Sequence, residues 1–131
     1  MLAVLNVAFF VFHTALILFN VFGWIPKRLR KWNLACLLLT LAGWTILGIW
    51  YGTGYCICTD WHWQVREAMG IRESADSYIV LLVRNLSGWD PPIDLANTVA
   101  MWTFIAAFSM SVTLNVRDWL QVRRKVCASA E

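Results

Sequence analysis

The strongest constraint on the fold is that three long apolar stretches alternate with connections of different charge. Each stretch has roughly the 20 residues that a helix needs to cross the hydrocarbon core of a bilayer. The first connection, 26–31, has four basic residues and no acidic one, whereas the second, 51–91, has three basic and five acidic residues. Because basic connections stay on the cytoplasmic side, this pattern predicts an N-terminus outside and a C-terminus inside.

Amino-acid composition agrees with three transmembrane helices. Hydrophobic residues make up 60% of the 131 residues, against roughly 45–50% in soluble domains. We predict one domain, 1–131, with spans at about 2–25, 32–50 and 92–116 and a cytoplasmic tail, 117–131. No basic residue precedes the first stretch, so we expect a retained helix and not a signal peptide.

The outer connection, 56–89, is too long and too apolar to be a bare loop. Asp60 is expected to cap one short helix, 60–69, and Ser77 a second, 78–86, each closed by a glycine. The second helix is too short to span the bilayer and should lie at the interface. The predicted fold is therefore all-α: an integral membrane three-helix bundle with a two-helix amphipathic lid on the outer, periplasmic face.

Polar residues form a stripe on the first predicted span. Asn6, His13 and Asn20 are seven residues apart, so they share one helix face. His13 lies near the bilayer midplane, where an ionisable residue is a functional hypothesis by default. A proton relay, a haem ligand, a quinone hydrogen bond and hydrogen bonds to neighbouring helices stay open. Thr40 and Thr45 of the second span lie near the right depth for His13.

A second set of polar residues begins the third span. Asp94 suits a helix N-terminus because the helix dipole stabilises a carboxylate there. Alternatively, Asp94 lines a polar pocket under the lid, together with Asn6 and with Asn97 at a similar height. Trp44, inside the second span, is expected to pack there or to contact a ligand. The candidate ligand-binding residues are Asn6, His13, Trp44, Asp94 and Asn97.

Two thiols and an imidazole lie within seven residues of the outer connection. Cys56, Cys58 and His62 could bind Zn or Cu(I), with Asp60 as a further ligand for tetrahedral zinc. The two cysteines could also form a disulfide, because the predicted side is oxidising. A third alternative is a redox pair that serves a membrane electron acceptor. All three alternatives stay open.

Other catalytic patterns are missing from the sequence. It contains no recognisable nucleophile–base pair, Gly-rich phosphate loop, HExxH motif or paired carboxylates. Membrane topology accounts for the basic residues, so no nucleic-acid partner is expected. We therefore name no catalytic residue and expect that the protein is not an enzyme.

The order of these features resembles a family of small bacterial membrane proteins known as domain of unknown function 2784. His13 is similar to that family's first-helix histidine. The basic turn 27–31 with Trp32 resembles its Arg- and Trp-containing turn. Further points of similarity are Gly54-Tyr55-Cys56 and Thr59, which resemble a Gly-Trp-x-Cys-Pro-Leu-Thr segment, and Tyr78-Ile79 and 88–92, which resemble a short outer helix and the turn before the last span.

Two departures from the family pattern concern the thiol segment. The Pro-Leu of the motif is replaced by Ile57-Cys58, so the second thiol is an addition here. The family's acidic residue after the threonine falls near His62. The resemblance implies the membrane topology and draws attention to His13 and Cys56, but it implies no activity.

We therefore expect a non-enzymatic accessory or scaffold protein of a bacterial cytoplasmic (inner) membrane. It would contact membrane lipids and bind a lipid, a quinone-like molecule or a membrane-protein partner, including a second copy of itself. No cofactor is required for this role. The alternative is a membrane thiol- or metal-dependent redox protein, with Zn or Cu, that uses Cys56, Cys58 and His62.

Overall fold

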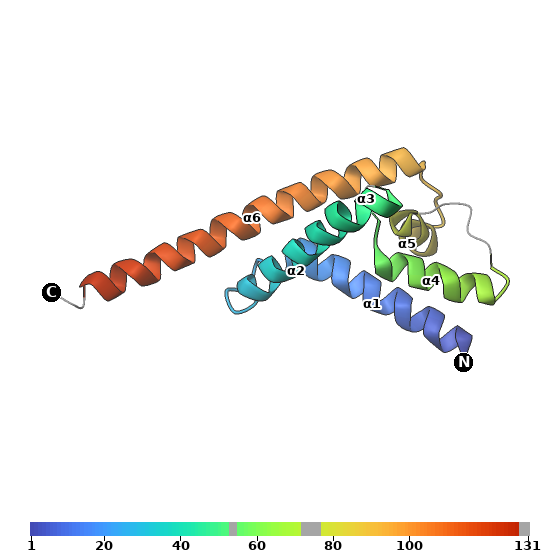
Figure 1. Ribbon diagram of the computed structural model, residues 1–131, viewed down its shortest axis with the longest axis horizontal. Coiled ribbons are helices and arrows are strands. Elements are labelled where there is room, and N and C mark those ends of the chain that lie inside the picture. Colours follow the sequence, from blue (N-terminus) through green and yellow to red (C-terminus); the bar gives the residue numbers. More distant parts are fainter. Residues whose placement is uncertain (53–54, 72–76, 129–131) are drawn as a thin grey trace.

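The computed structural model describes residues 1–52, 55–71 and 77–128 (Figure 1). Within these residues the chain forms helices and no strand, which confirms the all-α prediction. The helices are α1 (Leu2–Phe22), α2 (Arg30–Ala42), the π-helical turn η1 (Gly43–Leu47), α3 (Gly48–Tyr51), α4 (Ile57–Ala68), α5 (Tyr78–Ser87) and α6 (Ile93–Ala128).

Three helical segments are long and apolar enough to cross a membrane, as the sequence predicts. They are Leu2–Phe22, Arg30–Tyr51 and Ile93–Lys125, with mean hydropathies of 2.3, 1.8 and 1.6. The second comprises α2, η1 and α3. Large apolar side chains are exposed along all three, as expected for helices whose solvent is lipid.

Helix α6 is longer than the span predicted for it. It continues from Ile93 to Ala128 through most of the predicted tail. The segment 117–128 contains no Gly or Pro and is rich in Arg, Leu, Gln and Lys, which favour helix. Nothing in this part of the sequence ends the helix at the predicted boundary.

The two short helices lie close to their predicted positions but are capped differently. Helix α4 begins at Ile57 with Cys56 as its N-cap residue, so Asp60 lies in the first turn and not at the cap. Ser77 is the N-cap residue of α5, but its hydroxyl donates to Asn97 of α6 and not to its own helix. Gly88 ends α5 in the left-handed conformation, with φ of 73°.

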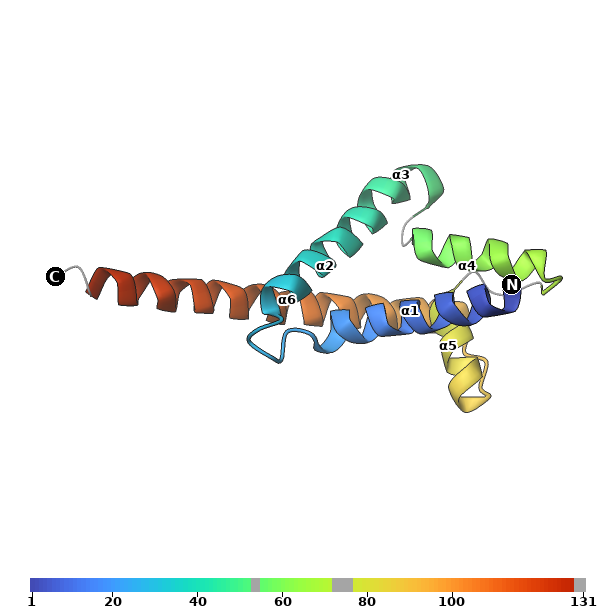
Figure 2. The ribbon, with the colours of Figure 1, turned by 90° about the horizontal axis from the view of Figure 1, so that it is seen from below.

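The three long helices contact one another as a bundle, but their axes diverge (Figure 2). Figure 2 shows α2 and α3 diverging from α1, while α4 lies alongside α1 and α5 crosses beneath the start of α6. His62 contacts Asn6 and the earlier residue Cys56 contacts the later residue His13, so α4 runs antiparallel to α1. We call the end with residues 23–29 the turn end and the other the α4–α5 end.

Polar side chains join the three long helices near the turn end. Asn33 of α2 is fully buried; its amide donates to the Phe19 carbonyl oxygen at 2.7 Å and to that of Asn20 at 3.3 Å. Ser111 of α6, also fully buried, donates to the Asn33 amide oxygen at 2.8 Å. Asn33 therefore links α1, α2 and α6, and it adds a second donor to the Phe19 carbonyl oxygen, which also accepts from the Gly23 N–H at 2.8 Å.

An ion pair between a buried arginine and a half-buried aspartate lies beside this contact. The Arg30 guanidinium donates to the Asp118 carboxylate at 2.7 Å and, through Nε, to the Trp24 carbonyl oxygen at 3.0 Å. Asn115 of α6 donates to the Arg30 carbonyl oxygen at 3.1 Å. Arg30, expected from the sequence only as part of a basic turn, is thus a structural residue that fixes α6 to the start of α2.

Candidate functional site

The second concentration of buried polar side chains lies at the α4–α5 end, between α1, α4 and α5. We call it the polar cluster. Its members come from α1, from α4 and its N-cap residue, and from α5, and each contacts at least one other member. They are Asn6 and His13 of α1, Cys56 and His62 of α4 and its N-cap, and Tyr78 of α5.

The part of the polar cluster nearer the N-terminus of α1 joins α4 to α1 through Asn6. His62 is fully buried, and its Nε2 donates to Asn6 Oδ1 at 2.8 Å. The Arg66 guanidinium donates to the same oxygen at 3.2 Å. The His62 ring also stacks on Phe9, with centroids 5.9 Å apart. One amide oxygen of α1 therefore holds two donors of α4, one helical turn apart.

The part of the polar cluster nearer the middle of α1 surrounds His13. This imidazole is 6% exposed. Its Nε2 lies 3.9 Å from Cys56 Sγ, and its ring stacks on Tyr78 with centroids 3.9 Å apart and an angle of 17°. Its Nδ1 is buried and has no hydrogen-bond partner among the described residues.

Tyr78 fixes the start of α5 to α1. Its hydroxyl donates to the Phe10 carbonyl oxygen at 2.7 Å and lies 2.9 Å from the Thr14 hydroxyl. Burial raises the pKa of Tyr78, and the hydrogen bond from Thr14 partly offsets that rise. The sequence pointed to Tyr78 only through the resemblance of Tyr78-Ile79 to a short outer helix, so its contact with His13 was not foreseen.

The predicted metal or disulfide residues are divided by the structure. Cys56 and Cys58 are half-buried free thiols, and burial, followed by the charge and hydrogen bonding of Cys56, raises the pKa of Cys58. His62 points to Asn6. In the described part of the chain, no group of three or more His, Cys, Asp or Glu is placed to hold a metal ion.

The five candidate ligand-binding residues do not converge on one site. Asn6 and His13 belong to the polar cluster. Trp44, in η1, packs against Phe104 of α6 with ring centroids 4.8 Å apart. Asp94 is exposed, and Asn97 accepts the Ser77 hydrogen bond at 3.0 Å.

The threonines expected near His13 have other partners. Thr40 accepts a hydrogen bond from the Asn20 side chain at 3.1 Å. The Thr45 hydroxyl donates to the Leu41 carbonyl oxygen of its own helical segment at 2.8 Å. The three-residue stripe of α1 is nevertheless used as one face: Asn6 and His13 contact α4 and α5, and Asn20 contacts α2.

The face of α1 opposite this stripe is open. It carries a shallow, wide-open apolar hollow that side chains of α1 alone line. Small and β-branched side chains form it, so the backbone of α1 is accessible to a neighbour. These residues are Ala3, Val4, Val7, Ala8 and Val11.

A comparison with protein families identifies the chain. Residues 3–116 match the family model described as Protein of Unknown function (DUF2784). The chain belongs to the DUF2784 family. No match was found among curated proteins or among solved structures.

The DUF2784 match covers the whole polar cluster and both short helices. It ends at residue 116, two positions before Asp118. The ion pair that fixes α6 to α2 therefore joins a residue inside the matched range to one beyond it.

Proposed function

We propose that this DUF2784 protein is a non-enzymatic accessory protein of a bacterial inner membrane, which binds a membrane-protein partner through the open face of α1. The observation that carries the proposal is the division of α1 into two faces. Its polar face holds α2, α4 and α5, while the opposite face keeps an apolar hollow.

The chemistry of the hollow favours a helix as occupant. Association of helices in lipid depends on close packing, which small residues allow. Ala3 and Ala8 are small, and Val4, Val7 and Val11 are short and β-branched, so this face has no long side chain that would hold a neighbouring helix away. No hydrogen-bond donor lines the hollow to orient the polar head of a lipid or a quinone. Those amphiphiles are therefore secondary candidates.

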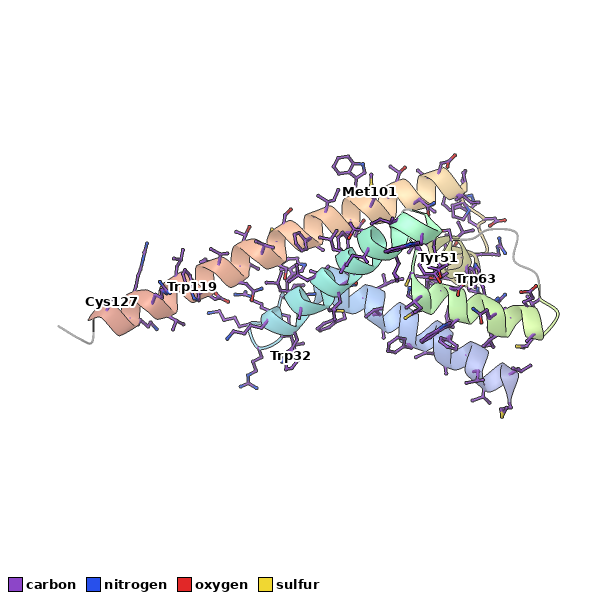
Figure 3. The ribbon with its side chains drawn as sticks, in the orientation of Figure 1. Trp32, Tyr51, Trp63, Met101, Trp119 and Cys127 are labelled. Atoms are coloured by element: carbon purple, nitrogen blue, oxygen red, sulfur yellow. The ribbon has the colours of Figure 1, made fainter. Side chains whose placement is uncertain are left out.

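The proposed orientation places the turn end in the cytoplasm and the α4–α5 end outside. Trp32 and Trp119 lie toward the turn end, and Tyr51 and Trp63 toward the other (Figure 3). Two aromatic groups at opposite ends suit the two interfaces of a bilayer. In this orientation α4 and α5 form the outer lid, and the basic residues 27–31 lie inside.

Site-specific photocrosslinking in cells tests the partner. A benzophenone amino acid at Val7, 59% exposed within the hollow, is expected to give a discrete crosslinked protein. The same probe at Leu39, 75% exposed on α2, is the matched control and is expected to give none. Ala8→Trp should fill the hollow and remove the Val7 product without lowering the amount of folded protein.

The outcomes separate the occupants. A crosslink to a second copy of the chain would name the partner as itself. Crosslinks to lipid alone, in equal yield from Val7 and Leu39, would contradict the proposal. A Val7 product that survives Ala8→Trp would also contradict it, because the crosslinked protein would then not occupy the hollow.

A second candidate function is thiol redox chemistry, favoured by the contact of Cys56 Sγ with His13 Nε2 at 3.9 Å. Oxidation would join the sulfurs of Cys56 and Cys58 and pass two protons and two electrons to a quinone, giving a quinol. Intact mass with metal analysis, with and without thiol alkylation, tests this candidate. A disulfide formed by added quinone, or a metal lost in Cys58→Ala, would favour it over the accessory role; two outer thiols that stay freely alkylated would exclude it.

A further inference from the structure

The turn end carries a strong excess of positive charge. Residues 23–31 and 111–128 contain eight Lys and Arg residues but one acidic residue, Asp118. That carboxylate is already bound to Arg30 at 2.7 Å. The remaining basic side chains at this end therefore need counter-charges from outside the described chain.

The fold gathers part of this charge around the ion pair. The Arg30–Asp118 ion pair, at 2.7 Å, brings Lys27 and Arg117, 90 residues apart in sequence, to the same end of the fold. Lys27, Arg28, Lys31 and Arg117 are all exposed. We call these four residues the turn-end basic cluster. The first three form no ion pair with any described residue, and Arg117 makes only a long contact of 4.0 Å to Asp118.

We propose that the turn-end basic cluster binds the phosphate headgroup of an anionic phospholipid. Charge complementarity identifies the occupant: lysine and arginine side chains at the membrane surface attract anionic lipid headgroups. Arg30 and Asp118 hold the two contributing segments together, and so pre-organise the site. This inference is independent of the partner proposed for α1.

Two features suit a lipid surface in particular. Trp32 and Trp119, which flank the cluster in sequence, are 72% and 53% exposed, as interfacial tryptophans are. Arg123 lies over the Trp119 ring, 4.1 Å from its centroid, and so holds that ring at this level without being part of the cluster. The cluster thus lies where headgroups would be, beside apolar helix surface that acyl chains would cover.

Native mass spectrometry of the purified full-length protein provides the test. The protein is released from micelles containing equal amounts of phosphatidylglycerol and phosphatidylcholine, and retained lipids are counted. The wild-type chain is expected to retain phosphatidylglycerol at least tenfold more often. Because detergent-solubilised protein is used, the way in which each variant inserts into a cell membrane does not affect the result.

Matched variants locate the site. Lys27→Gln/Arg28→Gln/Lys31→Gln should abolish the preference, whereas Arg123→Gln/Arg124→Gln/Lys125→Gln, with the same change of charge, should keep most of it. Arg117→Gln alone should lower it about fivefold, as expected from roughly 1 kcal/mol per basic residue near the surface. Lys27→Arg/Lys31→Arg should retain it.

Three results would overturn the proposal. Equal losses in the two triple variants would mean that binding follows net charge and has no site. An unchanged lipid preference in Arg117→Gln would mean that only residues 27–31 contribute and that the fold does not bring Arg117 into the site. Displacement of the lipid by millimolar inorganic phosphate would mean that the site is for a free anion. Thermal unfolding of each variant checks that it is folded.

Discussion

At the scale of single residues, polar side chains are as common as apolar ones among the buried positions of this protein. Few hydrophobic residues are buried, whereas Asn33 and Ser111 are completely so. In lipid, apolar surface gains little by leaving the solvent, so interhelical hydrogen bonds and close packing decide which helices associate. The positions that tolerate least change should therefore be polar or tightly packed.

Gly23 is the tightest of these positions. A Cβ there would lie 2.5 Å from the Phe19 carbonyl oxygen and 2.9 Å from Asn33 Nδ2. Gly23→Ala should therefore lower the free energy of unfolding by roughly 1–3 kcal/mol, the usual cost of overpacking. Thermal unfolding in detergent measures this. Gly43→Ala is the control, because nothing lies within 4 Å of its Cβ, and an equal loss there would refute the argument.

Cys58 should react slowly with alkylating reagents. Burial and the neighbouring Cys56 raise the pKa of its thiol, so less of it is thiolate at a given pH. We expect iodoacetamide to modify Cys58 more slowly in the folded protein than in the same protein unfolded in dodecyl sulfate, and its rate to keep rising at higher pH. Peptide mass spectrometry across a pH series gives both rates. Equal rates in the two states would contradict the raised pKa.

At the scale of helices, the contact of α4 with α1 depends on one side chain. Asn6→Leu would leave the His62 and Arg66 donors without this acceptor, at a cost of roughly 1–3 kcal/mol. Hydrogen exchange in α4 should then rise, while exchange in α2 stays as in the wild type. Thr45→Val is the control, since Thr45 bonds only within its own helical segment. Faster exchange in α2 as well would mean that the whole fold had loosened.

The sequence predicted the positions of the helices better than the side chains that each helix contacts. Apolar length and basic connections give three spans, and the spacing of Asn6, His13 and Asn20 gives one face of α1. Periodicity defines a helix face but does not say which residues cover it. Asn6 forms a hydrogen bond with His62, 56 residues away. Thr40 was expected near His13 but forms a hydrogen bond with Asn20. The sequence of a basic turn is also the same whether an arginine faces water or, like Arg30, is buried and paired with an aspartate.

At the scale of the whole molecule, the orientation in the membrane can be measured with Cys127. This thiol is exposed near the end of α6. In a variant with Cys36, Cys56 and Cys58 changed to Ala, a membrane-impermeant maleimide should label Cys127 in inverted inner-membrane vesicles and not in intact spheroplasts. The basic turn end predicts this orientation. Labelling of intact spheroplasts would reverse it and place the α4–α5 end in the cytoplasm.

The length of α6 has a mechanical consequence. Its 36 residues form one helix about 54 Å long, which exceeds the thickness of a bilayer's hydrocarbon core. Asn97 ties it to the start of α5, and Asp118 ties it to Arg30. The contacts of Ser111, Asn115 and Asp118 with α2 centre near residue 115. With this region as the pivot of a rigid lever, the arm to Asn97 is about 27 Å and the arm to Ala128 about 20 Å. A sideways displacement at the α5 end would therefore swing the far tip in the opposite direction by about three quarters as much.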